Sequence, residues 1–451
     1  MKSFKRFAIV LSILLCLAII MTGCGKSNQG SGDESSGTTS NTSSSTTSDT
    51  SNATPEKKIP IKFYGLIKEF PDGEAMIQKM QELLPHLDIQ PIQVDWGNLD
   101  QVVSIGIASG DPCDVYAFWP TMMKKYVDAG QALDLTPYLD ANDGEWRKQL
   151  SNGSLEMGTF DGKVYNVSYQ ISFDCLFVNA DAFEKAGVTI NPRWTWDEFI
   201  EAMKALKEKG GIDTPFSIFD DAVKGLFFKP LDDLIENVGK KDEAVAGNYP
   251  LNGDDAKYVL TCVKELFNSG LWYGGKGALN ISRDEAKAAF VQGKTAVLVE
   301  GAAMYASLAQ ECDFKIEPVL YPTMKTDPSK VAAGGYGDGL FVPSNAKHPE
   351  EAVECLKVFT GPEVQKIHAD AGFVVTNVNT QPSDPTVLKL VELTQNIGDG
   401  KSFVNIAPQK FYDHINKVLL PSVLLSNQSI EKALNELDEV RKKALEDAAN
   451  N

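Results

Sequence analysis

Histidine is scarce in this chain of 451 residues, and cysteine occurs without the spacing that metal or redox sites need. The four histidines are far apart, with no i,i+4 pair and no Cys–His arrangement of the kind that binds zinc; they are His86, His348, His368 and His414. None of the seven cysteines forms a C-x-x-C pair. The sequence therefore predicts no metal centre and no cofactor.

Positive charge is also under-represented. The chain has 43 Lys and Arg residues against 61 Asp and Glu residues, for a net charge of −18. Nucleic-acid binding needs a surplus of Lys and Arg to neutralise phosphates, and docking on an anionic membrane needs a basic face. The composition argues against both classes of partner.

Only one long apolar run is present, from Phe7 to Met21, and its 15 residues are too few for a membrane-spanning helix. Lys2, Lys5 and Arg6 precede it, which is typical of a signal peptide. The run ends in Met21-Thr22-Gly23-Cys24, which resembles the lipobox of bacterial lipoproteins. The resemblance implies that residues 1–23 are removed and that Cys24 is acylated, for example with palmitate. The alternative is a plain secretory signal with an incidental cysteine. In the favoured reading the lipid alone holds the protein at the extracytoplasmic face of the cell membrane.

A tether follows over residues 24–57. Between Ser27 and Thr54, 17 of 28 residues are Ser or Thr and none is aromatic, so this segment cannot bury a core. Five cysteines remain beyond it: Cys113, Cys175, Cys262, Cys312 and Cys355. Because five is an odd number without motif spacing, buried free thiols are favoured, with a chance disulfide or a reactive thiol left open.

Strand-like and helix-like patterns alternate from residue 58 onward. Residues 59–65 alternate as in a strand, 76–84 carry one apolar helical face, 89–96 are β-like, and 114–118 form a short apolar strand. Such alternation favours an α/β fold with parallel strands. Thr195 with Glu198 and Ser282 with Glu285 predict capping boxes, Pro349 and Pro362 stand at first-turn positions, and residues 430–440 predict a closing amphipathic helix.

Enzyme motifs are missing. Gly293-Lys294-Thr295 looks like the end of a P-loop, but the first glycine is absent and a helix precedes it where a strand is required. There is no G-x-S-x-G elbow and no H-E-x-x-H motif. A hydrolase with two carboxylates far apart in the sequence would leave no local signature, so that alternative stays open.

Several segments match motifs of one family in order and spacing: Ala108–Val115, Asp161–Val167, Leu176–Val188 with Trp194–Phe199, Ala289–Gly301, and Gly334–Ala352. They resemble family 1 extracellular solute-binding proteins, the maltose-binding-like components of ABC importers. The run from Leu176 to Phe199, similar to L-Y-Y-N-K-D-x-F-E-K-A-G followed by T-W-D-E-F, is the most specific. The resemblance covers essentially all of residues 58–451.

The resemblance implies a two-lobed, type II-like periplasmic-binding-protein fold with three crossings between the lobes. By position the crossings fall near Ser168–Phe173, Gly334–Asp338 and Asn396–Phe403. Lobe 1 would then comprise residues 58–168 and 339–396, and lobe 2 residues 174–333 and 404–451. Four glycines between Gly334 and Gly339 suit either a hinge or a rigid turn.

The resemblance also implies ligand contacts in the cleft. The main candidates are Trp119 as a stacking ring, Asp174 as a hydroxyl-binding carboxylate, Glu300 and Tyr305 in place of a missing tryptophan, and Tyr336 and Asp338 in the second crossing. Weaker candidates are Tyr64, Lys68, Trp96, Trp272, Phe411 and Tyr412. Each has an ordinary core or surface role as its alternative.

The function implied is that of a monomeric, non-enzymatic lipoprotein that captures a carbohydrate, in particular an oligosaccharide, and delivers it to ABC permease subunits. An extracellular carbohydrate hydrolase is the main alternative. A binding partner of a sensor, with the same fold, is a third.

Overall fold

The computed structural model describes residues 57–65, 72–94, 98–325, 327–328, 335, 337–394, 397 and 401–449. Four of the residues expected to carry lipid or bind ligand, Cys24, Lys68, Trp96 and Tyr336, lie outside this part of the chain, and so do Gly334 and Asn396, where two of the crossings were expected to begin. No described helix has both the length and the apolar character needed to cross a membrane. The five cysteines beyond the tether are all unpaired.

The first lobe is built on a mixed sheet with the order β2-β1-β3-β11-β6. Its strands are β1 (Ile59–Gly65), β2 (Leu87–Gln93), β3 (Val115–Phe118), β6 (Val167–Ser168) and β11 (Gly339–Phe341). β1 is parallel to β2 and β3, whereas β11 is antiparallel to both β3 and β6. In this sheet the expectation of parallel strands therefore holds for the pairings of β1 and is wrong for the pairings of β11. A separate antiparallel pair joins β4 (Thr159–Phe160) to β5 (Lys163–Val164).

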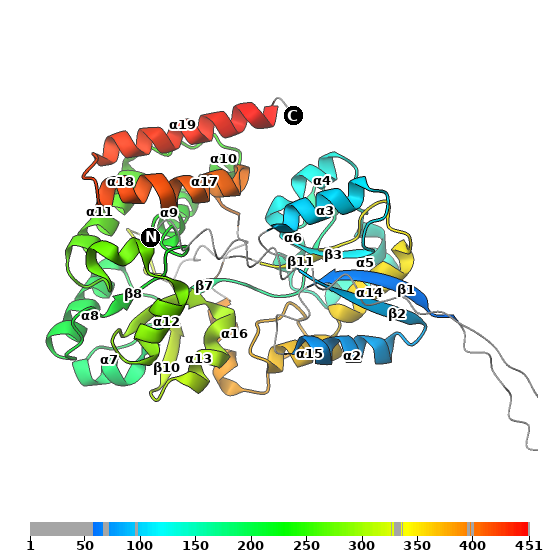
Figure 1. Cartoon of the computed structure of the whole chain (residues 1–451), viewed down its shortest axis with the longest axis horizontal. Helices are drawn as coiled ribbons and strands as arrows, with labels where there is room; N and C mark the ends of the chain where they lie inside the picture. Colours follow the sequence, from blue (N-terminus) through cyan, green and yellow to red (C-terminus); the bar gives the residue numbers. More distant parts are fainter. Residues whose placement is uncertain are drawn as a thin grey trace, which may run out of the picture. The chain divides into compact units, whose positions relative to one another are not determined.

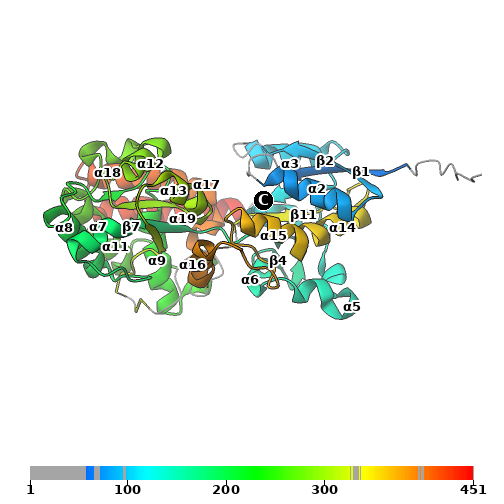
Figure 2. The ribbon, with the colours of Figure 1, turned by 90° about the horizontal axis from the view of Figure 1, so that it is seen from below.

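Seven helices contribute to the apolar core of this lobe (Figures 1 and 2). They are α2 (Gly73–Leu83), α3 (Leu99–Ala108), α4 (Lys124–Asp128), α5 (Thr136–Lys148), α6 (Asn152–Glu156), α14 (Pro349–Phe359) and α15 (Pro362–Asp370). α14 and α15 each begin at a proline, where the missing N–H has no helical partner to lose.

The second lobe is built on a sheet with the order β10-β7-β9-β8. Its strands are β7 (Asp174–Asn179), β8 (Phe216–Ser217), β9 (Val297–Gly301) and β10 (Ile316–Val319). β7 lies in the middle and is covered on both faces. Leu176 and Val178 face one core, while Cys175 and Phe177 face another, as the twofold alternation of a strand requires.

One face of this sheet packs against a large helical group, and the other against a smaller one (Figure 1). The larger group holds α7 (Ala180–Ala186), α8 (Trp196–Glu208), α9 (Gly225–Asn237), α10 (Lys241–Val245), α11 (Asp254–Asn268), α17 (Pro408–His414), α18 (Leu420–Leu424) and α19 (Ile430–Ala449). The smaller group holds α12 (Arg283–Val291), α13 (Tyr305–Glu311) and α16 (Pro385–Thr394).

The chain passes between the lobes three times. Residues 169–173 join β6 to β7, residues 320–338 join β10 to β11, and residues 371–384 join α15 to α16. The third crossing differs from the expected position at Asn396–Phe403. Leu390 and Leu393 of α16 pack in the same core as Phe177 and Ile316, so α16 belongs to the second lobe and the crossing precedes it.

The described parts of the three crossings lie side by side. The Ile171 amide donates to the Val374 carbonyl at 2.7 Å, and the Tyr169 amide donates to the Asp338 carbonyl at 3.2 Å. Residues of the first crossing therefore contact both of the other crossings. A movement of one lobe relative to the other would strain these two backbone hydrogen bonds.

Candidate functional site

A pocket of about 220 Å³, which we call the α9 pocket, lies where the first two crossings meet α9 and the segment after residue 400. Its lining residues come from both lobes: Thr121, Ser172, Phe173, Asp174, Phe228, Lys229, Asp232, Gly335, Lys401, Ser402, Val404, Asn405 and Tyr412. Polar and aromatic side chains dominate this lining.

One wall of the α9 pocket is formed by α9 itself. Phe228, Lys229 and Asp232 stand at i, i+1 and i+4 and line the pocket, while Leu231 and Leu234 are buried in the lobe core. The neighbouring Asp233 faces inward and forms a buried ion pair with Arg193. This internal pair fixes the rotation of the helix, and so directs Asp232 toward the pocket.

Lys229 and Asp174 form an ion pair in the pocket. Their Nζ and Oδ2 atoms are 2.9 Å apart, with the lysine largely buried and the carboxylate nearly half exposed. The ammonium also lies 5.1 Å from the centre of the Tyr321 ring, a cation–π distance. Desolvation would raise the pKa of Asp174, but the positive charges of Lys229, Lys224 and Arg283 outweigh it and hold that pKa below its usual range.

Asp232 has a different environment. The Ser402 hydroxyl donates to its carboxylate at 2.5 Å and the Phe403 amide donates at 3.3 Å. Burial raises the pKa of Asp232 to about 7, because the desolvation cost of the charged form exceeds what these two hydrogen bonds return. The pocket thus holds one carboxylate that stays ionised and one that titrates near neutral pH.

Aromatic rings complete the pocket. The rings of Phe228 and Tyr412 lie 5.7 Å apart at 41°, and Lys224 lies 5.1 Å from the centre of Tyr412. Ring faces beside carboxylates, hydroxyls and an amide suit a ligand with apolar C–H faces and many hydroxyl groups. Within the described residues, no group of three or more His, Cys, Asp or Glu side chains is arranged to hold a metal ion.

Trp119 and Asp338 lie near each other in the first lobe. Trp119 follows β3, is partly exposed, and its side chain is near enough to the Asp338 carboxylate to favour the charged form. The Gln170 amide donates to the same carboxylate at 2.5 Å. Burial raises the pKa of Asp338 to about 6, while Gln170 and Trp119 oppose that shift in part.

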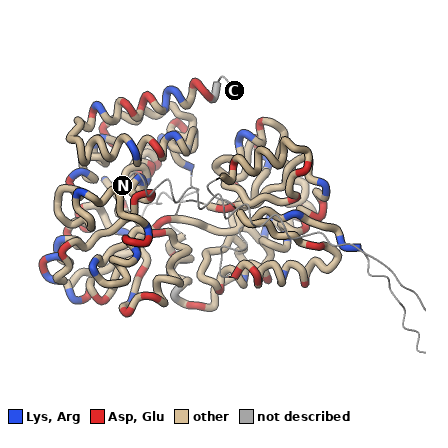
Figure 3. The backbone as a smooth tube through the Cα atoms, viewed as in Figure 1, with Lys and Arg blue, Asp and Glu red and all other residues tan. Residues whose placement is uncertain are grey.

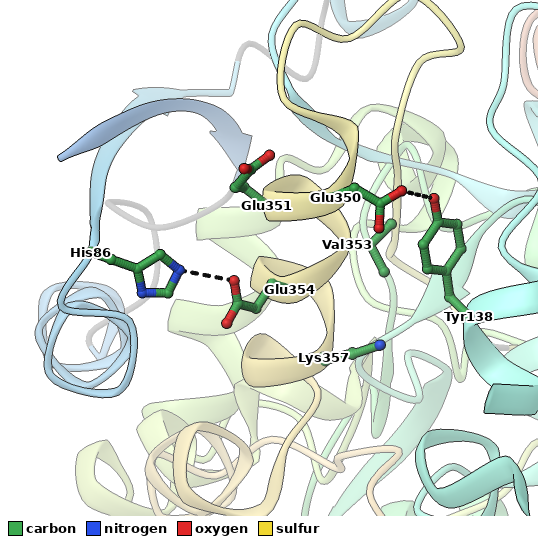
Figure 4. Close-up of a pocket in the computed structure, with 7 residues that line it drawn as sticks. All are labelled: His86, Tyr138, Glu350, Glu351, Val353, Glu354 and Lys357. Carbon is green, nitrogen blue, oxygen red and sulfur yellow. Dashed lines mark hydrogen bonds and ion pairs between the residues drawn. The ribbon is translucent and has the colours of Figure 1, made fainter. Parts of the chain in front are cut away.

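A second pocket, of about 460 Å³, lies on the outer side of α14 (Figure 4). Its polar groups are largely occupied by one another: Glu354 contacts the His86 ring at 3.0 Å, and the Tyr138 hydroxyl donates to Glu350 at 2.6 Å. All of its lining residues belong to the first lobe. The α9 pocket, which draws on both lobes, is therefore the stronger candidate for the functional site.

Comparison with known proteins agrees with the two-lobed architecture. The family model for bacterial extracellular solute-binding proteins matches residues 67–366. The chain belongs to this family. An arabinooligosaccharide-binding protein of Bacillus subtilis is 24% identical over 311 residues, which cover 67% of this chain and 68% of the relative.

Solved structures of solute-binding proteins share the fold. MalE, a sugar-binding protein of Xanthomonas citri, gives a TM-score of 0.71 at 16% identity and covers 86% of this chain and 98% of its own. RafE of Streptococcus pneumoniae, solved as the apo-form, gives a TM-score of 0.69 at 19% identity, and the match covers 87% of this chain and 99% of RafE. RafE in complex with raffinose gives the same TM-score and identity, and that match covers 86% of this chain and 100% of RafE. At these identities the likeness establishes the α/β two-lobed fold of this solute-binding protein.

The structure brings together only some of the residues expected to bind ligand in this solute-binding protein. Asp174 and Tyr412 line the α9 pocket. Trp119 and Asp338 lie near each other, and neither lines the α9 pocket. Glu300 is buried and forms a two-pronged ion pair with Arg283, at 2.5 and 2.7 Å, so its oxygens are already occupied.

Four other candidates lie in the lobe cores. The Tyr305 ring is 2% exposed and stacks on Phe177 at 5.6 Å. Tyr64, Trp272 and Phe411 are likewise buried. Their rings fill the interior and are closed to a ligand in this structure, which corrects their assignment as cleft residues.

Sequence reasoning missed the α9 wall and the 401–405 segment. Lys229, Asp232 and Asp233 interrupt an otherwise apolar stretch from Gly225 to Ile235, and these charged residues were the available signal. No local pattern links Asp232 to Ser402, because the two residues are 170 positions apart.

Proposed function

We propose that this solute-binding protein captures a carbohydrate, an oligosaccharide in particular, between the α9 pocket and Trp119, and delivers it to the permease of an ABC transporter. The observation that carries the proposal is the composition of the pocket: the Phe228–Tyr412 ring pair lies beside Asp174, Asp232 and the hydroxyl of Ser402. Sugar rings need both kinds of contact. Two similar proteins, the arabinooligosaccharide-binding protein and RafE in complex with raffinose, support the same ligand class.

A thermal-shift screen against mono- and oligosaccharides tests the proposal. A ligand present at 100 times its dissociation constant should stabilise the folded state by about 2.7 kcal/mol. Loss of a stacked ring should cost about 1–3 kcal/mol of binding, so Trp119→Ala should weaken affinity by that amount in isothermal titration calorimetry.

A second test compares the sugar affinity of Asp174→Asn with that of a control variant, Asp128→Asn. Asp174 lines the pocket, whereas Asp128 forms an exposed ion pair with Lys124 on α4. We expect only the first to weaken binding. A folded Trp119→Ala or Asp174→Asn variant with the parent affinity would contradict the proposed site.

We further propose that Cys24 carries the lipid that holds the protein at the extracytoplasmic face of the membrane. Cys24→Ala should move the protein from the membrane fraction to the soluble fraction, whereas Cys113→Ala should leave it with the membranes. A Cys24→Ala variant that still sediments with membranes would disprove the anchor.

One observation favours a second candidate function, carbohydrate hydrolysis. Asp174 and Asp232 share a pocket, and their environments move their pKa values in opposite directions, as in an acid and nucleophile pair. Incubation of the tightest-binding oligosaccharide with the protein should leave its reducing ends unchanged if the protein only binds. New reducing ends that Asp232→Asn abolishes would establish the hydrolase instead.

A further inference from the structure

The two lysines among the described residues that line the α9 pocket are each held by a carboxylate of the protein. These lysines are Lys229 and Lys401. The Nζ atom of Lys229 lies 2.9 Å from Oδ2 of Asp174, which also lines the pocket. The Nζ atom of Lys401 lies 3.0 Å from Oε1 of Glu156. Both positive charges that face the ligand space are therefore balanced before any ligand arrives.

Two further cations beside the pocket are balanced in the same way. Lys224 lies 5.1 Å from the centre of the Tyr412 ring, which lines the pocket. Its Nζ atom is 2.6 Å from Oδ1 of Asp221. Arg283, the first residue of α12, donates from Nε and Nη2 to the two carboxylate oxygens of Glu300, at 2.7 and 2.5 Å.

The Arg283–Glu300 pair adjoins the pocket through the sheet of the second lobe. Asp174, at the start of β7, pairs with Gly301 at the end of β9. Glu300 precedes Gly301 in β9, and its Oε1 atom also accepts the Gly301 amide at 2.7 Å. The Glu300 side chain is 2% exposed, whereas that of Arg283 is 55% exposed. A buried carboxylate thus holds an exposed guanidinium next to the strand end that carries Asp174.

Asp232 adds negative charge to this arrangement. It lines the pocket and is held by neutral donors, the Ser402 hydroxyl at 2.5 Å and the Phe403 amide at 3.3 Å. The surplus charge of these groups is therefore zero when Asp232 is protonated and negative when it is ionised. The same mixing of signs extends over the chain, where basic and acidic positions are interspersed in both lobes (Figure 3).

An acidic sugar gains little from such a wall. Its carboxylate or phosphate would have to displace a protein carboxylate from a lysine or arginine, which exchanges one ion pair for another and leaves the displaced acid without its partner. Sites that select anions direct the donors of Arg or Lys at the ligand itself. A hydroxyl group needs no such exchange, since it can accept a hydrogen bond from a paired cation and donate one to a carboxylate.

We propose that the α9 pocket selects uncharged sugars and rejects acidic ones, because the protein itself balances the cations at and beside its wall. The inference rests on the proposed function of this site and adds the charge of the ligand to it. Glu300 and Asp221 are then specificity-determining residues, which act on the ligand through the charges of Arg283 and Lys224.

Isothermal titration calorimetry with matched probes tests the selection. The probes are maltotriose, cellotriose, arabinotriose and raffinose, each compared with the acid obtained by oxidising its primary hydroxyl groups to carboxylates. For the probe that binds best, the neutral form should bind about tenfold more tightly than its oxidised form, as expected for one unbalanced charge near a protein surface. Its affinity should be the same in about 0.05 M and about 0.5 M NaCl, because salt screens only charged partners.

Two variants remove a balancing charge while keeping the shape of the side chain. Glu300→Gln and Asp221→Asn each leave one cation unbalanced, so the ratio of neutral to oxidised affinity should fall by about tenfold. The Asp221 side chain is 78% exposed, so this variant tests the inference even if the buried Glu300 does not tolerate substitution. Glu311→Gln is the matched control. Glu311 pairs at 2.7 Å with Lys287, one turn beyond Arg283 on α12, and its loss should keep the parent ratio.

The inference is wrong if an oxidised probe binds the parent as tightly as its neutral form, or if the folded variants keep the parent ratio. It is also wrong if the trimer of glucosamine, which carries ammonium groups, binds more tightly than cellotriose, since Asp232 would then set the charge of the ligand. In each of these outcomes a carbohydrate still binds and the proposed function stands. A protein that binds none of the probes in either form would contradict the proposed function, and the inference with it.

Discussion

Asp232 shows how one side chain can make this protein sensitive to pH. Its carboxyl lines the α9 pocket and accepts hydrogen bonds from the Ser402 hydroxyl and the Phe403 amide. Burial raises the pKa of Asp232 to about 7, so the buried carboxyl is neutral in acid. At neutral pH part of the folded protein carries an ionised, buried Asp232, which lowers the free energy of unfolding.

Asp232→Asn should remove that cost. The pKa of an unfolded Asp is about 3.9, below the folded value, so the folded state binds more protons between about pH 4 and 7. Stability from this group is complete below about pH 4 and is lost as the pH rises through about 7. We expect urea unfolding of Asp232→Asn to show a shallower fall in unfolding free energy across this range than the parent.

Asp338, whose pKa burial also raises, to about 6, should contribute to the slope that remains in that experiment. Asp128→Asn, on an exposed ion pair, should keep the parent slope. Identical slopes in the parent and Asp232→Asn would show that Asp232 is ionised in the folded protein at much lower pH.

At the scale of elements, the capping boxes differ in completeness. At the start of α8, the Thr195 hydroxyl accepts from the Glu198 amide while the Glu198 carboxylate accepts from the Thr195 amide. At the start of α12, the Ser282 hydroxyl accepts from the Glu285 amide at 3.2 Å, and that single bond forms the cap.

Thr195→Ala should therefore cost more stability than Ser282→Ala. Loss of an N-cap hydroxyl typically costs about 1 kcal/mol, and Thr195→Ala also removes the hydrogen bond that this hydroxyl donates to the Glu198 carboxylate at 2.9 Å. The measurement is the free energy of unfolding in urea for both variants at one pH. A larger loss for Ser282→Ala would show that this additional hydroxyl–carboxylate bond contributes nothing measurable.

The sequence predicted helix starts well, because the residues that fix them lie within one turn of the helix. The prolines at 349 and 362 and the Thr195 cap mark helix starts because their chemistry acts within one turn. Strand direction could not be predicted for β11, since alternation of side chains is the same in either direction. The third crossing was misplaced because the apolar face of α16, with Leu390 and Leu393, fits either lobe equally well on sequence alone.

The candidate site was less accessible to sequence reasoning than the fold. Asp174 and Trp119 were predicted through family motifs, whereas the position of Lys229 and Asp232 on the pocket wall depends on the rotation of α9, to which the buried Arg193–Asp233 pair contributes. Tyr305 and Trp272 were predicted to contact the ligand but are buried in the core. The sequence alone does not distinguish an aromatic residue that fills a core from one that stacks on a sugar.

At the scale of the whole molecule, binding should close the lobes around the ligand. Proteins of this architecture move as rigid bodies about a few connecting residues, so saturating ligand should reduce the radius of gyration in solution scattering. The tightest sugar of the screen is the probe, with a sugar that gives no thermal shift as the control. An unchanged profile with the tight ligand would exclude closure.

The contact between the first two crossings sets a limit on that motion. A Cβ atom at Gly337 would lie 2.3 Å from the Cβ of Ser172, whereas one at Gly277 would meet nothing within 4 Å. Gly337→Ala should thus cost about 1–3 kcal/mol of stability, as overpacking does, and weaken sugar binding. Gly277→Ala should change neither, and a Gly337→Ala variant equal to it in both measurements would show that the crossings separate freely.

The five unpaired cysteines have a consequence for the lifetime of the protein outside the cell. Cys175, Cys262 and Cys355 are buried, and burial raises the pKa of Cys262 to about 11 and that of Cys355 to about 12, so little reactive thiolate forms while the fold is intact. Global unfolding would expose all five to oxidants at once, and an odd number cannot pair without a remainder. Mispaired chains could not refold, so the durability of this protein in an oxidising medium is set by how slowly it unfolds rather than by the free-energy difference between its folded and unfolded states.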